Sequence, residues 1–135
     1  KVNEVNMNKI TKEMLHIYKP VSNLDWMNYK LVKKDVTFHH IDKKCEGGRK
    51  IISNGALLMP LSHQYLHLIE FKDIETYITI NKIFKIVNNQ KFEPNKDQRE
   101  IIEYLLQEFE YKHRFDKNSK GKLLIKEEYK QRFCR

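Results

Sequence analysis

The sequence predicts an α+β fold in which two short antiparallel strands and a helix are embedded among amphipathic α-helices. Residues 35–41 (DVTFHHI) and 50–59 (KIISNGALLM) are short apolar stretches, and the loop between them contains Gly47 and Gly48. Residues 74–109 instead repeat apolar side chains at helical spacing. With 135 residues, the chain has the length of a single domain.

Each element is placed by its apolar spacing and by the residues at its ends. Helices are expected over residues 3–17, 63–71, 73–90 and 94–115, and a last basic helix after residue 121. Ser62 is the candidate N-cap of the second helix. Residues 20–34 are expected to be irregular, with Trp26 and Tyr29 covering the core. The stretch 50–59 is expected to begin as a strand, turn through Asn54 and Gly55, and continue as a connection.

The composition favours a folded protein with an uneven positive charge. Hydrophobic residues make up 40% and charged residues 33%, which argues against wholesale disorder. No apolar run approaches the roughly 18 residues that a membrane span requires, so no membrane partner is expected. The net charge is +8, distributed as +5 over residues 1–67, −3 over residues 68–110 and +6 over residues 111–135. A polyanion would favour the front and the tail and avoid the middle, although solubility alone also explains the charge.

The two cysteines, Cys45 and Cys134, form no CxxC pair, so this chain alone cannot build a thiolate zinc site. We expect two free thiols in a reducing cytoplasm.

The histidines are the candidate functional residues. His39 and His40 are adjacent at the end of the first strand, and His63 and His67 share one face of the following helix because they are four residues apart. Neighbouring strand residues point to opposite faces, so His39 and His40 reach one site only if the strand ends or twists there. Otherwise one of them is an ordinary core residue. The stretch HQYLH is no protease motif, because Gln64 cannot act as the glutamate base.

The order of these residues resembles the HNH endonuclease family, also called the ββα-metal or His-Me finger, in its HH…N…H…H form. Asn54 follows His40 by 14 residues, His63 follows Asn54 by 9, and His67 follows His63 by 4. The resemblance covers residues 36–70. It implies a single HNH nuclease domain with the ββα-metal core at 36–70, an N-terminal helix and cover at 1–34, helical support at 73–115 and a basic tail at 116–135.

The sequence departs from the family at one structural site. Many HNH proteins place a cysteine pair around the second strand to hold a zinc ion, and Met59 and Ser62 stand at those positions here. The resemblance therefore implies a domain without this zinc knuckle, held together by its helices.

The resemblance also implies the chemistry. His40 would act as the general base in hydrolysis of a DNA phosphodiester bond, and Asn54 would tie the hairpin together and position it. His39, His63 and His67 would bind one divalent ion, Mg²⁺ or Mn²⁺ in use, with Zn²⁺ or Ni²⁺ as alternatives. The residues that could grip neighbouring phosphates are Lys43, Lys44, Arg49 and Lys50.

Several expectations about partners stay open at this stage. DNA is the expected partner and RNA the less favoured one, and a homodimer is compatible with the helical stripes. The expected setting is the cytoplasm of a bacterium or a phage-infected cell, with a secreted toxin as the alternative. The rival function is a non-catalytic DNA-binding or protein-interaction module that keeps the metal finger as a scaffold.

Overall fold

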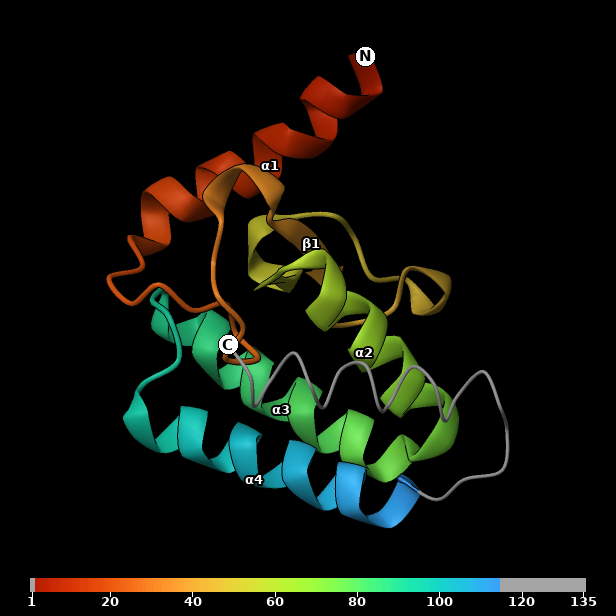
Figure 1. The fold of residues 1–135 in the computed structure, drawn as a ribbon. Helices are drawn as coiled ribbons and strands as arrows, with labels where there is room; N and C mark the ends of the chain where they lie inside the picture. The colour runs from red at the N-terminus through yellow and green to blue at the C-terminus, as the bar shows by residue number, and fades with distance from the viewer. Residues whose placement is uncertain (1, 115–135) are drawn as a thin grey trace.

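The computed structural model of the chain describes residues 2–114, with side chains from residue 9 onward. This part is a small α+β fold of four α-helices, three short 3₁₀ turns and one two-stranded sheet. In Figure 1, α3 and α4 run alongside each other at the bottom of the view, α1 lies at the top, and the hairpin and α2 lie between them. The expected α+β class is confirmed; the basic tail at 116–135 and Cys134 lie outside the described residues.

The sheet consists of β1 (Thr37–His40) and β2 (Gly55–Leu58), paired antiparallel with Thr37 opposite Leu58 and His40 opposite Gly55. The expectation that the second strand precedes a turn at Asn54 and Gly55 is wrong, because β2 begins at Gly55 itself. All four β2 residues are buried, and a Cβ added at Gly55 would lie 2.4 Å from the Phe38 ring. Glycine therefore allows the two strands and the core to approach closely.

The helix α2 (Pro60–Lys72) begins three residues earlier than expected. Its N-cap is Met59 and Pro60 occupies the first turn, a position where proline costs no hydrogen bond. Ser62 is not the N-cap, which corrects the sequence-based expectation. Ser62 lies in the first turn of α2, where its buried side chain donates the hydroxyl proton to the carboxylate of Asp25.

The other helices agree with their apolar spacing: α1 (Val2–Tyr18), α3 (Ile74–Gln90) and α4 (Lys96–His113). Asp73 caps α3 by accepting a hydrogen bond from the Thr76 amide. Asn95 and Gln98 form a reciprocal capping box at the start of α4. The buried stripes of α3 and α4 pack together with α2 into the core, whose largest enclosed side chains include Trp26, Tyr65, Phe84 and Phe109.

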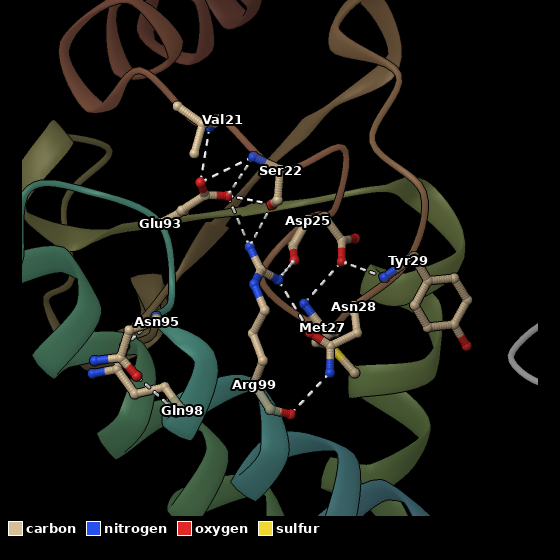
Figure 2. Close-up of polar contacts among 10 residues, drawn as sticks. All are labelled: Val21, Ser22, Asp25, Met27, Asn28, Tyr29, Glu93, Asn95, Gln98 and Arg99. Atoms are coloured by element: carbon tan, nitrogen blue, oxygen red, sulfur yellow. Dashed lines mark hydrogen bonds and ion pairs between the residues drawn. The ribbon is translucent and has the colours of Figure 1, made fainter.

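The irregular segment before β1 is fixed to the start of α4 by a polar network (Figure 2). The Glu93 carboxylate accepts hydrogen bonds from the Val21 and Ser22 amides and pairs with the Arg99 guanidinium at 3.0 Å. Arg99 also donates to the backbone oxygen of Asp25 at 2.7 Å. This network allows a segment without regular structure to keep Trp26 and Tyr29 buried, as expected from the sequence.

None of the helices within residues 2–114 combines the length and the apolarity needed to cross a membrane.

Candidate metal and catalytic site

Asn54 ties the two ends of the β1–β2 connection together. Its side-chain oxygen accepts from the Asp42 amide at 2.8 Å, and its amide nitrogen donates to the backbone oxygens of Asp42 at 3.1 Å and Arg49 at 2.9 Å. Its backbone oxygen also accepts from the Ile41 amide. The structure thus contains the cross-hairpin bonds expected of Asn54, and they hold the chain immediately after His40.

The hydrogen bonds of the Asn54 side chain to Asp42 and Arg49 (the Asn54 clasp) close a loop that requires both of its glycines. Gly47 has a φ of 91°, in the left-handed region that glycine tolerates best. At Gly48, a Cβ would lie 1.8 Å from the backbone oxygen of Asp42. The chain can therefore turn back beside the end of β1 only with no side chain at that position.

His39 and His40 lie on opposite faces of β1, and β1 ends at His40. His39 is 2% exposed and faces α2 and α3, where its ring lies 6.0 Å from that of Phe84. His40 is partly exposed and packs edge-on against Phe38 at 4.9 Å. Both histidines nevertheless line one cleft of about 330 Å³, because the strand stops at its rim.

His63 and His67, one turn apart on α2, line the same cleft and lie close to His39. The ring centres of His39 and His63 are 5.4 Å apart, those of His63 and His67 4.9 Å, and those of His39 and His67 6.5 Å. Imidazoles bound to one ion at ~2.1 Å have ring centres roughly 5 Å apart. The three rings are therefore spaced on the scale of a shared metal ion.

The hydrogen bonds decide which nitrogen of each imidazole carries the proton. Thr37 donates its hydroxyl proton to the Leu58 oxygen at 2.7 Å, so its contact with His63 Nδ1 at 3.0 Å requires Nδ1–H as donor. His39 donates from Nε2 to the Asn81 oxygen at 2.8 Å. His67 directs Nδ1 to the Glu70 carboxylate at 3.4 Å.

In these tautomers each of the three histidines keeps one nitrogen that none of these contacts uses: Nδ1 of His39, Nε2 of His63 and Nε2 of His67. A second group that holds the other ring nitrogen is typical of metal-binding histidines, since it fixes both the tautomer and the ring orientation. The donor set therefore fits a divalent ion.

The side chains are not arranged for binding in their described positions. Among the residues that the structure describes, no group of three or more His, Cys, Asp or Glu side chains could hold a metal ion as they stand. The His63 and His67 rings are stacked with an interplanar angle of 21°.

Burial lowers the pKa of His39, His40 and His63 and so favours their neutral forms. The pKa of His39 is lowered to about 4, mainly by burial, with the Asn81 hydrogen bond opposing this and the neighbouring imidazoles adding to it. The pKa of His63 is also lowered to about 4, by burial and by His67 and His40. For His40, burial and the nearby Lys50 and Lys44 lower the pKa. Near pH 7 these three imidazoles are therefore available as proton acceptors or ligands.

Only two of the four basic residues expected near the phosphate lie at the histidine cleft. Lys43 and Lys44 line the histidine cleft, whereas Arg49 and Lys50 are not among its lining residues. Lys43 forms an ion pair with Glu70. Lys50 lies over the Phe38 ring at 5.8 Å, and Arg49 is exposed and contributes its backbone oxygen to the Asn54 clasp.

Three residues of the site were missed by sequence reasoning: Thr37, Glu70 and Asn81. One signal for Asn81 was present, because it is a polar residue within the apolar stripe of α3, between Tyr77 and Phe84. Glu70 also had a local signal, because it follows His67 by three residues on one helix. Nothing in the local pattern marks Thr37, whose contacts are with Leu58 and His63.

Comparisons of the chain with protein-family models, with curated proteins and with solved structures found no match.

Proposed function

We propose that the protein is a metal-dependent endonuclease of the HNH type that hydrolyses DNA phosphodiester bonds. The observation that carries the proposal is the set of three histidines around one cleft, each with one ring nitrogen held by a neighbouring group and the other not used in that contact. The order β1, β2, α2 with Asn54 as the clasp supports the ββα-metal finger as the core of the fold.

His39, His63 and His67 would hold the ion. When bound, a divalent ion stabilises negative charge on the phosphate and on the leaving 3′ oxygen. Three imidazoles favour Zn²⁺, Ni²⁺ or Co²⁺ by affinity, whereas Mg²⁺ and Mn²⁺ suit oxygen ligands better. Asn81, Thr37 and Glu70 hold one ring nitrogen of His39, His63 and His67, respectively, which would leave the other nitrogen of each ring for the ion.

His40 would accept the proton of the attacking water. It is partly exposed at the rim of the cleft, and its lowered pKa leaves it unprotonated at neutral pH. The Asn54 clasp fixes the backbone directly after His40, so the base would be held at a constant position relative to the cleft. Lys44, exposed beside the cleft, is available to a neighbouring phosphate.

Plasmid nicking by purified protein tests this proposal. The protein is stripped of metal and then given Mg²⁺, Mn²⁺, Ni²⁺ or Zn²⁺. We expect metal-dependent nicking that falls at least ~100-fold in His40→Ala. His16→Ala, which removes an exposed imidazole from α1, is the matched control and should cut like the wild type. Absence of cleavage with every metal, or equal cleavage by His40→Ala, would overturn the catalytic assignment.

Metal binding is tested separately by calorimetric titration with Ni²⁺ or Zn²⁺. We expect one site per chain, weakened at least ~10-fold by His63→Ala but unchanged by His16→Ala. Equal affinity in these two variants would refute the proposed ligand set without any reference to cleavage.

A protein-interaction module is the second candidate function. The observation in its favour is the number of large apolar side chains exposed on the helices, among them Phe71 at 79%, Tyr111 at 67% and Tyr104 at 61%. If binding to a partner or to a second copy were the whole function, His40→Ala would leave it intact.

A further inference from the structure

We propose that a groove between α3 and the loop after β1 binds the DNA strand that continues beyond the phosphate to be cut. The groove has a volume of about 690 Å³, roughly twice that of the histidine cleft at about 330 Å³. The proposal rests on the nuclease function and names where its substrate extends.

The groove adjoins the histidine cleft. Lys43 and Tyr77 line both hollows, and the Lys43 ammonium lies 5.7 Å from the centre of the Tyr77 ring. Glu70 holds Lys43 from the side of the histidine cleft. Lys43 and Tyr77 thus border both hollows, so a strand that leaves the histidines past Lys43 enters the groove.

The charged side chains of the groove favour a phosphate backbone. Lys43, Lys82 and Lys85 line it, opposed by two carboxylates, Asp42 and Glu46. The Lys85 ammonium is 3.8 Å from Asp42, but both side chains are more than 60% exposed. Such an exposed pair contributes little stability, so Lys85 can turn to a phosphate at small cost. Lys82 is exposed one turn earlier on the same face of α3.

The apolar side chains of the groove suit the sugars and bases between phosphates. Ile74 is 50% exposed and Ile78 is 46% exposed, and both lie on the α3 wall. The opposite wall includes Gly47 and Gly48, which carry no side chains that could obstruct a ligand. Lysines along a groove with apolar walls suit a nucleic-acid strand that is bound without reading of its sequence, since cations meet the phosphates and the walls meet sugars and bases.

Fluorescence anisotropy with a labelled 12-nucleotide DNA strand, and with its duplex, tests the groove. The full chain carries His40→Ala in every sample and EDTA is present, so that no cleavage occurs. Lys82→Ala and Lys85→Ala should each weaken binding about three- to tenfold and reduce the salt slope by about 0.7 for the single strand. Ile78→Glu, at a half-exposed position that tolerates the change, should weaken binding further by repelling phosphates. Lys96→Ala is the control, because Lys96 is an exposed lysine outside both hollows.

The outcomes separate this proposal from the nuclease assignment. If Lys82→Ala, Lys85→Ala and Ile78→Glu bind DNA like Lys96→Ala, or if the parent protein binds no DNA, the groove proposal is overturned. If these variants weaken binding but the wild type nicks no plasmid with any metal, the groove stands as a DNA-binding surface and the catalytic assignment fails.

Discussion

Replacement of Asp25 by Asn should destabilise the protein by about 3 kcal/mol, because this carboxylate joins the irregular segment before β1 to the start of α2. Oδ1 accepts from the amides of Met27 at 2.8 Å and Tyr29 at 3.0 Å. Oδ2 accepts from the Met59 amide at 2.8 Å and from the Ser62 hydroxyl. Asp25 is 1% exposed, so water cannot replace any of these bonds.

The magnitude follows from what Asn can and cannot replace. Asn retains one acceptor oxygen, which serves Met27 and Tyr29, but presents an amide donor to the Met59 N–H. The Ser62 hydroxyl can rotate and accept from that donor, whereas the Met59 amide is left unpaired in the interior. A buried unpaired donor costs ~1–3 kcal/mol, and lost hydrogen bonds to a charged group cost ~1.5–3 kcal/mol. About 3 kcal/mol is a large part of a typical stability of ~5–15 kcal/mol.

Urea unfolding followed by circular dichroism measures this change. Asp35→Asn is the control, because Asp35 is exposed in a 3₁₀ turn and its replacement should stay within ~0.5 kcal/mol of the wild type. If Asp25→Asn is also within ~0.5 kcal/mol, Asp25 does not anchor the start of α2. If the loss is confirmed, the start of the helix that carries His63 and His67 depends on Asp25, which lies 34 residues before Met59 in the chain.

Three further predictions concern the hairpin and the histidines. Asn54→Ala removes three side-chain hydrogen bonds and should cost ~2–4 kcal/mol in urea unfolding; a loss below ~0.5 kcal/mol would show that the clasp contributes no stability. Gly48→Ala places a Cβ 1.8 Å from the Asp42 oxygen and should lower the melting temperature by several degrees, at roughly 4–8 °C per kcal/mol for a domain of ~100 residues; an unchanged melting temperature would mean that the loop relaxes freely. The pKa values of His39 and His63 are lowered to about 4, so the unfolded chain takes up protons first as the pH falls below ~6.5. The free energy of unfolding of the metal-free protein should therefore be constant above this pH and fall as the pH drops from ~6.5 to ~4. The buried His39 alone should account for about 3 kcal/mol of this fall. Equal free energies of unfolding at pH 7 and pH 4.5, measured by urea unfolding in EDTA, would contradict the prediction.

The sequence alone determined the features that depend on neighbours along the chain. The helical stripes of α3 and α4 follow from the spacing of residues such as Tyr77, Ile80 and Phe84, because one helix face repeats every 3.6 residues. The hairpin and its loop follow from two apolar stretches around Gly47 and Gly48. The succession of His39, His40, Asn54, His63 and His67 likewise marked the candidate site before any coordinates.

Only the tertiary structure decided the features that depend on residues far apart in the sequence. The second strand begins at Gly55 rather than ahead of Asn54, because the buried side of the hairpin needs a residue without a side chain against Phe38. The cap-like contact at the start of α2 comes from Asp25 instead of Ser62. The tautomer of His39 is set by Asn81, 42 residues away. Local spacing specifies helices and strands because their hydrogen bonds are local, whereas the protonated nitrogen of a buried imidazole is chosen by whichever acceptor the folded chain brings beside it.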